Sequence, residues 1–144
     1  MVTKQDDSDI MEIIDTYSKE YAEDTIVDEF RLNEMLLKIP GIKGKWVTYF
    51  SINQAKLYKL TKEAENLIEE AVPVIQQKRE TEGHNVTKKG AEMIVKNTKK
   101  YKELSDKISK LKVLDQYFQR SLGMIQYINQ DLRNFIDSKK MDEM

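Results

Sequence analysis

The side chains best suited to chemistry in this chain are lysines gathered in its middle. Nine lysines lie between positions 88 and 112, against three acidic residues in the same stretch. On a helix that turns by about 100° per residue, six of them share an arc of roughly 100°: Lys89, Lys96, Lys99, Lys100, Lys107 and Lys110. Such a basic face can lie along the phosphates of a nucleic acid, with binding that weakens steeply in salt. The alternative is a solvated helix face.

The net charge of the whole chain hides this basic stretch. The net charge is −1, yet residues 1–40 carry 4 basic and 11 acidic side chains, whereas residues 41–112 carry 16 basic and 9 acidic ones. Residues 113–144 carry 4 basic and 5 acidic side chains. This segregation predicts that a polyanion would meet the middle of the chain and not its acidic start.

Residues for catalysis, metal binding or cofactor binding are scarce. The chain has no cysteine, and its single histidine, His84, has no cysteine or second histidine with which to share a metal ion. The segment Gly41 to Trp46 is not a nucleotide-binding loop, because Ile39 stands at the first glycine position. The aspartates from Asp6 to Asp9 lack the glycine and the distal glutamate of a calcium loop. We therefore expect a binding protein without metal or cofactor, and not an enzyme.

The spacing of apolar residues predicts an all-α fold in which these side chains are placed on helices. Only 7 of the 144 residues are glycine or proline and 34% are charged, which is typical of helical and coiled-coil chains. The acidic N-terminal segment, residues 1–24, is expected to contain a short helix after Asp9. Residues 25–144 are expected to form a single helical, oligomerising, DNA-binding domain. Its first helix is expected over about Thr25–Ile39, with a break at Pro40.

The first of two long amphipathic helices is predicted from Trp46 onward. Its apolar seam alternates four and three residues over four heptads, and consists of Trp46, Phe50, Asn53, Leu57, Leu60, Ala64, Leu67, Ala71 and Val74. Pro73 interrupts this seam, and either a stop near Val72 or a kink is compatible with it. A polar loop is expected over residues 79–85, followed by Thr87 as the N-cap of the next helix.

The second long helix is predicted to run from Thr87 to about Asp137. At 1.5 Å per residue it would be about 75 Å long, roughly twice the width of a compact domain of this size. Either it bends near Gly123, or neighbouring subunits bury its apolar seam. The expected self-association residues are Tyr101, Leu104, Ile108, Leu111, Phe118, Leu122, Ile125, Leu132 and Ile136.

Several short motifs follow one another along residues 26–136. They are Val27-Asp28 followed by Leu32, Lys45-Trp46, Glu92-Met93, Ser121-Leu122-Gly123-Met124, and Gln130-Asp131-Leu132-Arg133-Asn134-Phe135. In this order they resemble the UvsY-like recombination mediator proteins of T4-type phages, in which a basic-Ser-x-Gly segment precedes a closing helix with Gln-Asp-x-Arg-x-Phe. The resemblance implies an all-helical protomer that forms a ring-like homo-oligomer.

The resemblance also implies a function and a set of partners. Such a protein binds single-stranded DNA and helps a RecA-like recombinase to displace single-strand-binding protein. The family's short Lys-x-Arg DNA-contacting element falls here on Glu69-Glu70-Ala71, which cannot bind phosphate. We therefore expect the DNA contacts at the end of the first long helix and along the lysine-rich stretch. The expected DNA-binding residues are Lys78, Arg79, Lys88, Lys89, Lys96, Lys99, Lys100, Lys107 and Lys110.

A coiled-coil adaptor or structural subunit with no role in nucleic-acid binding is the alternative function. In that case the lysines would only keep a long helix soluble. No apolar run approaches the roughly 18 residues of a membrane helix, and the acidic start is unlike a signal peptide. We therefore expect a cytoplasmic protein, in the host cytoplasm if a phage encodes it.

Overall fold

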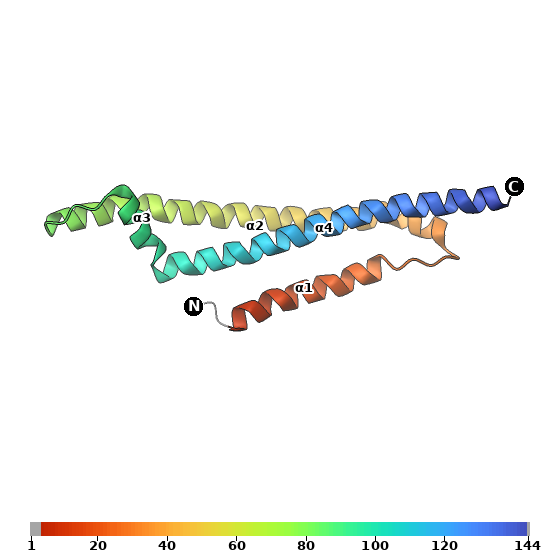
Figure 1. Cartoon of the computed structure of the whole chain (residues 1–144), viewed down its shortest axis with the longest axis horizontal. Helices are drawn as coiled ribbons and strands as arrows, with labels where there is room; N and C mark the ends of the chain where they lie inside the picture. The colour runs from red at the N-terminus through yellow and green to blue at the C-terminus, as the bar shows by residue number, and fades with distance from the viewer. Residues whose placement is uncertain (1–3, 144) are drawn as a thin grey trace. The chain divides into compact units, whose positions relative to one another are not determined.

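The structure of the chain, a computed structural model, describes the backbone of residues 4–143 and the side chains of residues 9–143. Within these residues the chain forms α1 (Lys4–Asp24), α2 (Leu32–Thr81), α3 (Lys88–Lys96) and α4 (Lys99–Asp142), as Figure 1 shows. No strand occurs between residues 4 and 143. The predicted all-α class with two long helices is therefore confirmed. No helix in the described part of the chain is long and apolar enough to span a bilayer.

Two compact units share the long helices α2 and α4. Unit 1 contains the residues up to Asn53 and those from Val113 onward, and unit 2 contains Gln54–Lys112. The acidic segment 1–24 was expected to stand apart, but α1 contributes to unit 1, where Tyr17 packs against Trp46 of α2 and Phe118 of α4. The expected boundary at residue 24 therefore does not coincide with a boundary between the units.

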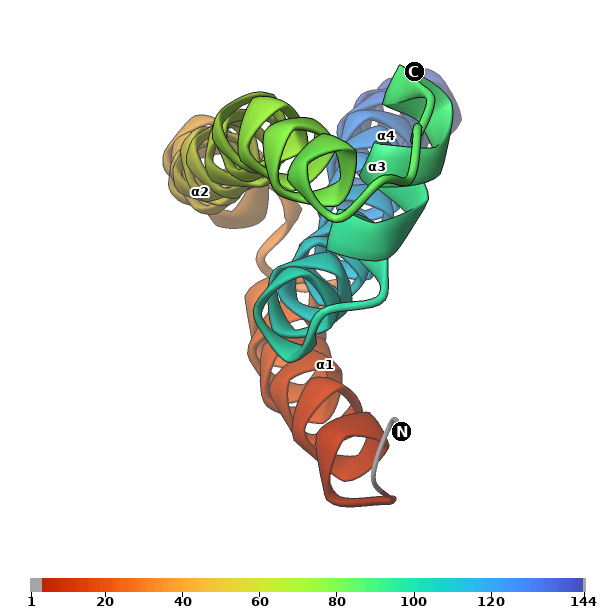
Figure 2. The ribbon, with the colours of Figure 1, turned by 90° about the vertical axis from the view of Figure 1, so that its left-hand side faces the viewer.

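Aromatic rings form the centre of unit 1, at the point where its three helices meet. Trp46 is 0% exposed and Phe118 is 2% exposed. The ring of Tyr17 contacts Phe118 edge-on, with centroids 5.0 Å apart, and the ring of Tyr21 contacts Trp46 edge-on at 5.5 Å. Edge-to-face pairs of this kind contribute about 0.5–1.5 kcal/mol each beyond the area that they bury. Figure 2 views the helices end-on, with α1 in red.

Polar side chains of α1 bind this aromatic centre from its edge. The Trp46 indole N–H donates a hydrogen bond to Asp24 Oδ2 at 3.0 Å, and the Tyr49 hydroxyl donates one to Glu20 Oε1 at 2.6 Å. The Lys45 ammonium forms ion pairs with both carboxylates, at 2.9 Å from Glu20 Oε1 and also with Asp24. The hydrogen bonds satisfy a fully buried indole, and they fix the position of α1 along α2.

The apolar seam of α4 is buried within unit 1 itself. Three of the expected self-association residues, Phe118, Ile125 and Leu132, are at most 4% exposed. These three side chains are therefore already buried within the protomer, and their role in subunit contacts stays a prediction. Helix α4 also runs without interruption through Gly123. The other six expected residues are half-buried: Tyr101, Leu104, Ile108, Leu111, Leu122 and Ile136.

Unit 2 has a smaller core, centred on α3. Ala91 and Val95 of α3 are at most 2% exposed and pack with Val72 of α2, which is 5% exposed. The residues packed around them are Leu67, Ile68, Ala71, Ile75, Val86 and Tyr101. Val74, a predicted seam residue, is instead 63% exposed. A straight α-helix drifts by about 20° per heptad from a 3.5-residue repeat, which carries Val74 off the seam after four heptads.

Neither proline ends its helix. Helix α2 continues through Pro40 and Pro73 as far as Thr81, so the predicted break at Pro40 is wrong, as is a stop near Val72. A proline in a helix loses one hydrogen bond and crowds the carbonyl four residues earlier, at a cost of about 3 kcal/mol. Burial of the residue before each proline, Ile39 and Val72, helps to offset this cost.

The predicted helix over Thr25–Ile39 is wrong in its first half, because residues 25–31 form a connection. Asp28 directs the chain there: its Oδ1 accepts a hydrogen bond from the Phe30 N–H at 2.9 Å, and its carbonyl accepts one from the Arg31 N–H at 3.0 Å. Local hydrogen bonds from an aspartate compete with the helix. Helix α2 therefore begins only at Leu32.

The variant Asp24→Ala should destabilise unit 1, because it removes the acceptor of the buried Trp46 indole and one partner of Lys45. Leaving a buried donor unsatisfied costs about 1–3 kcal/mol, which urea unfolding would measure. The matched control is Asp15→Ala, which removes an exposed ion pair with Lys19 on the same helix and should cost less than about 1 kcal/mol. Equal losses in the two variants would contradict the role assigned to Asp24.

Unit 1 should also lose stability in alkali. The hydrogen bond to Glu20 raises the pKa of Tyr49, and the hydrogen bond to Asp24 raises the pKa of Lys45. Each group holds its proton more tightly in the folded state, so its contribution is complete below a pH of about 10 and is lost as the pH rises further. Between pH 8 and pH 11 the midpoint of thermal unfolding should fall more steeply in the wild type than in Tyr49→Phe. Tyr127→Phe, at an exposed position, should match the wild type.

Candidate nucleic-acid interface

The basic charge of the chain belongs to unit 2. Its residues Gln54–Lys112 include 14 basic and 9 acidic side chains, whereas the rest of the chain has 10 basic and 16 acidic ones. The charge segregation seen in the sequence therefore coincides with the two compact units. All nine residues expected to bind DNA lie in unit 2, on three different helices.

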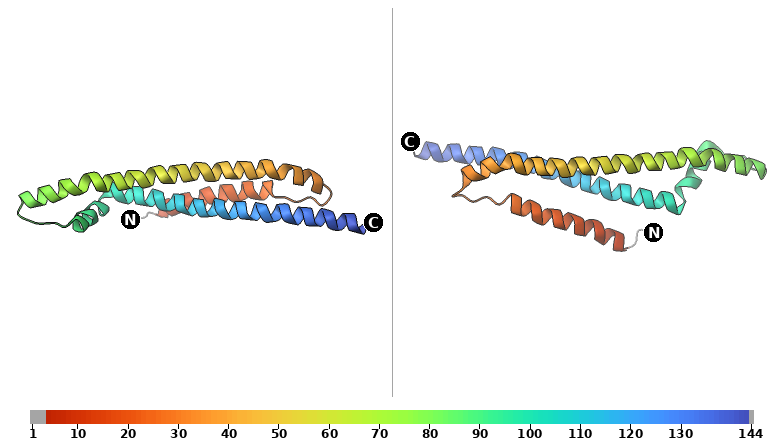
Figure 3. Two further views of the ribbon diagram at one scale, coloured as in Figure 1. Left: turned by 90° about the horizontal axis from the view of Figure 1, so that it is seen from above. Right: turned by 180° about the vertical axis from the view of Figure 1, so that it is seen from behind.

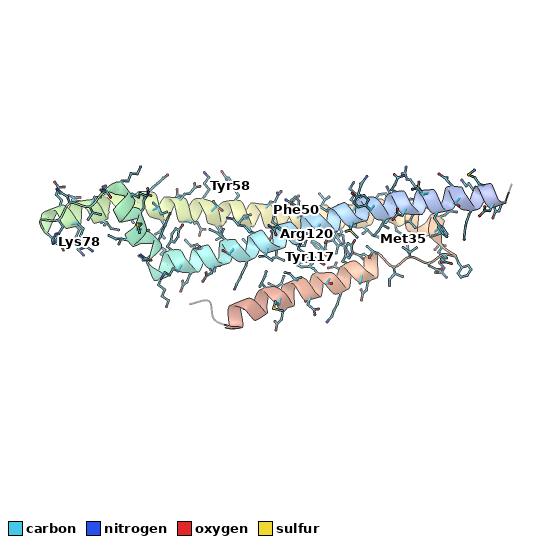
Figure 4. The ribbon with its side chains drawn as sticks, in the orientation of Figure 1. Met35, Phe50, Tyr58, Lys78, Tyr117 and Arg120 are labelled. Atoms are coloured by element: carbon cyan, nitrogen blue, oxygen red, sulfur yellow. The ribbon has the colours of Figure 1, made fainter. Side chains whose placement is uncertain are left out.

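The end of α2 places the first two of these residues, Lys78 and Arg79, in its last turn. The helix closes with two overlapping hydrogen bonds: the Gly83 N–H donates to the Glu80 carbonyl at 3.0 Å, and the His84 N–H donates to the Arg79 carbonyl at 2.8 Å. This closure needs a left-handed residue, which Gly83 supplies with a φ of 85°. Basic side chains are also favoured at a helix C-terminus. Figure 4 shows Lys78 near this end of α2.

Helix α3 carries the next three residues, Lys88, Lys89 and Lys96. It begins at the predicted N-cap, because Thr87 Oγ1 accepts a hydrogen bond from the Gly90 N–H at 3.0 Å. Gly90 makes a close approach, since a Cβ atom there would lie 3.2 Å from the Thr87 hydroxyl and 3.2 Å from a Val86 methyl group. The Gln76 amide of α2 donates to the Val86 carbonyl at 3.2 Å, which ties this loop to α2.

The predicted single helix from Thr87 to Asp137 is broken between α3 and α4, and Figure 1 shows α3 running at a steep angle to the start of α4. Thr98 makes the break, because its hydroxyl donates to the Val95 carbonyl at 2.6 Å and accepts from the Tyr101 N–H at 3.3 Å. A threonine in this position ends one helix and caps the next. The expected arc of six lysines on one helix is therefore wrong.

Two shorter basic faces replace that arc. Lys89 and Lys96 are seven residues apart on α3 and share one face of it. On α4 four lysines fall within an arc of about 100°, and these are Lys99, Lys100, Lys107 and Lys110. Glu103 lies in the same arc, at 4.0 Å from Lys99. The face of α4 is therefore basic with one acidic interruption.

Most of the expected DNA-binding side chains are accessible. All nine are exposed except Lys110, which is half-buried. Among the side chains that the structure describes, Lys99 pairs with Glu103, while Lys78, Arg79, Lys88, Lys89, Lys96, Lys100 and Lys107 form no ion pair. Cations without internal partners keep their full attraction for an external anion.

An exposed aromatic ring could stack on an unpaired base, but most tyrosines of the two long helices are core residues. Tyr49 and Tyr117 contact Trp46, and Tyr101 packs against the core of unit 2. Tyr58 differs, because it is 67% exposed on α2 and the Lys62 ammonium lies 5.6 Å from the centre of its ring. Figure 4 shows Tyr58 on α2, well before Lys78.

The lysines around Tyr58 were missing from the expected site. Lys56, Lys59 and Lys62 are all exposed. The hydrogen bond with Glu65 raises the pKa of Lys62. The signal that could have found them is a tyrosine with three lysines within four residues of it. It was missed because the apolar seam of this helix dominates its pattern.

The other motifs singled out in the sequence do not form sites. Gly41 to Trp46 lies inside helix α2, so it cannot wrap a phosphate as a loop. His84 is an exposed loop residue. Asp6 and Asp7 lie outside the residues whose side chains the structure describes. Within the described residues, no group of three histidine, cysteine or carboxylate side chains is placed to hold a metal ion.

Comparison with known proteins gives one informative match. No protein-family model matches the chain, and no curated protein sequence is similar to it. Among solved structures, the crystal structure of the bacteriophage T4 recombination mediator protein UvsY matches with a TM-score of 0.74. The two sequences are 10% identical, and the match covers 90% of this chain and 98% of that chain. The chain therefore has the fold of the T4 recombination mediator UvsY.

Proposed function

We propose that the chain is a recombination mediator, which binds single-stranded DNA and helps to load a RecA-like recombinase onto strands covered by single-strand-binding protein. The observation that carries this proposal is the fold shared with T4 UvsY over 90% of this chain and 98% of that chain. Because function resides in sites and not in folds, the side chains of unit 2 supply the second line of support.

The DNA-binding step of the proposal rests on the charge of unit 2. Its exposed lysines on α3 and α4 can each neutralise a phosphate, and counterion release then supplies the free energy of binding. Tyr58, with three exposed lysines near it, offers a surface on which an unpaired base can stack. A combination of basic groups and an accessible aromatic ring favours a single strand, because the bases of a duplex are already stacked.

No catalytic step is needed for this function. A mediator acts through binding free energy: many weak phosphate contacts hold the strand, while other surfaces engage the recombinase and the single-strand-binding protein. Self-association would strengthen the grip on DNA, because the second and later contacts become intramolecular. Unit 1, with its excess of acidic side chains, leaves a surface of the opposite charge for protein partners.

The variant with Lys96, Lys99, Lys100 and Lys107 all replaced by glutamine should lose binding to a single strand. Each lost phosphate contact should reduce the slope of log affinity against log salt by about 0.7. Fluorescence anisotropy with a labelled oligonucleotide, at two salt concentrations, measures both the affinity and this slope. A duplex of the same length should bind more weakly than the single strand to the unmodified protein.

The matched control changes the net charge by the same amount in unit 1. Lys19, Lys38, Lys43 and Lys140 are exposed there, and replacing all four by glutamine should leave the salt slope unchanged. Equal effects of the two quadruple variants would show that only the net charge matters and would reject the proposed interface. If the unmodified protein does not bind a single strand at low salt, the chain is an adaptor without a role in nucleic-acid binding.

The mediator step has its own test. A single strand is first covered with single-strand-binding protein, and the ATPase activity of a RecA-like recombinase then reports filament formation. Adding the chain should shorten the lag before ATP hydrolysis, and the quadruple lysine variant of unit 2 should not. An unchanged lag with the DNA-binding protein would restrict its function to DNA binding and refute recombinase loading.

A further inference from the structure

Helices α2 and α3 enclose a groove within unit 2. Figure 3 shows the chain turning back after α2, so that α3 lies beside the last part of that helix. The groove has a volume of about 470 Å³, which lies within the range of about 300–1,000 Å³ that is usual for ligand pockets. Its floor is apolar: Val72 is buried, Ile68 is half-buried and Pro73 is exposed. The groove therefore offers an accessible apolar surface to another molecule.

The two walls of this groove are held together by contacts that need no ligand. Ala91 and Val95 of α3 pack against Val72 of α2 in the core of unit 2. The Gln76 side chain, which lines the groove, donates a hydrogen bond to the Val86 carbonyl at 3.2 Å. A site that is already formed avoids the conformational entropy cost of ordering its walls on binding. A ligand can therefore enter the groove without a rearrangement of α2 or α3.

Three carboxylates line the groove on both sides, although unit 2 as a whole is basic. Glu65 and Glu69 lie one helical turn apart on α2, and Glu92 of α3 is half-buried. Glu65 pairs with Lys62 at 3.2 Å, whereas Glu69 and Glu92 form no ion pair with a described side chain, not even with Lys88 at the same groove. A half-buried carboxylate without a counter-charge has lost hydration and gained nothing in return. A cationic ligand would supply the missing charge.

We propose that this groove binds a basic segment of a partner protein, in which arginine or lysine alternates with apolar side chains. Successive side chains of an extended segment point to opposite sides, so the apolar ones can cover Ile68 and Pro73 while the basic ones reach Glu69 and Glu92. An arginine can form two parallel hydrogen bonds with one carboxylate. DNA does not fit this groove, because the carboxylates repel phosphates, and a polyamine lacks the branched apolar groups that would fill the floor. The proposal goes beyond the proposed function and does not depend on DNA binding.

Fluorescence anisotropy with a labelled peptide of sequence Arg-Leu-Arg-Leu-Arg-Leu-Arg and the full chain, without DNA, tests this groove. The peptide should bind with a dissociation constant of about 100 µM or less, and replacing its leucines by serine should weaken binding at least tenfold. The double variant Glu69→Gln with Glu92→Gln should weaken binding of the leucine peptide at least tenfold. The matched control, Glu63→Gln with Glu80→Gln, changes two exposed carboxylates of α2 outside the groove and should bind like the wild type.

A further variant separates loss of binding from loss of folding. Pro73→Lys places an ammonium in the groove and also removes the proline from the interior of α2, which relieves the crowding that a proline causes in a helix. It should keep the helical circular-dichroism signal and fail to bind the peptide.

Four outcomes would overturn the proposal. They are no binding of the leucine peptide by the wild type, equal losses in the two double variants, unchanged binding by Pro73→Lys, and displacement of the labelled peptide by spermine as effective as by unlabelled peptide. The double variant Glu69→Gln with Glu92→Gln should bind a single strand at least as tightly as the wild type. A chain that binds DNA but not the peptide would reject this groove alone, whereas one that binds the peptide but not DNA would reject only the proposed function.

Discussion

An indole ring can be buried at little cost only where its N–H finds an acceptor, and unit 1 is organised around this requirement at Trp46. The ring is closed off by aromatic neighbours from α1, α2 and α4, while the acceptor is Asp24 at the end of α1. The same carboxylate binds Lys45, one residue before Trp46. Helix α1 therefore completes the core both as an apolar cover and as the source of a counter-charge. Without it, Trp46, Tyr49 and Phe118 would form an exposed aromatic surface between two helices.

Helix positions could be predicted from the sequence where the apolar periodicity was long. The prediction failed where a few local hydrogen bonds determine where a helix begins or ends. The seam from Trp46 to Leu67 predicts the buried face of α2, because every member of it is buried or half-buried. The helix start at Thr87 could be predicted, whereas the break at Thr98 could not. A polar residue before an apolar pattern is a recognised start of a helix, but a threonine inside one continuous pattern is not. The two prolines were misleading because burial of the residue before each of them, Ile39 and Val72, helps to offset the cost of the lost hydrogen bond.

The candidate interface shows the same limit at the level of side chains. The basic charge counted in the sequence coincides with unit 2, because charge counts do not depend on how the helices are divided. The shared arc of lysines did depend on how the chain is divided into helices. The turn at Thr98 distributes these lysines over α3 and α4. Burial separated the tyrosines that periodicity alone could not: Tyr58 is exposed, while Tyr49, Tyr101 and Tyr117 are packed against other residues. The exposure of Phe30 could not be predicted from the sequence either, because it depends on the turn at Asp28, which no periodic pattern marks.

The division of charge between the two units has a practical consequence for handling the protein. A chain with a net charge of −1 is expected from its titration curve to interact weakly with charged resins near neutral pH. Separate acidic and basic surfaces change that behaviour, since each can bind the resin of opposite charge independently of the total. The protein should therefore be retained on anion-exchange and on cation-exchange columns at the same pH. Polyanions from the cell should elute with it unless the salt concentration is raised during lysis.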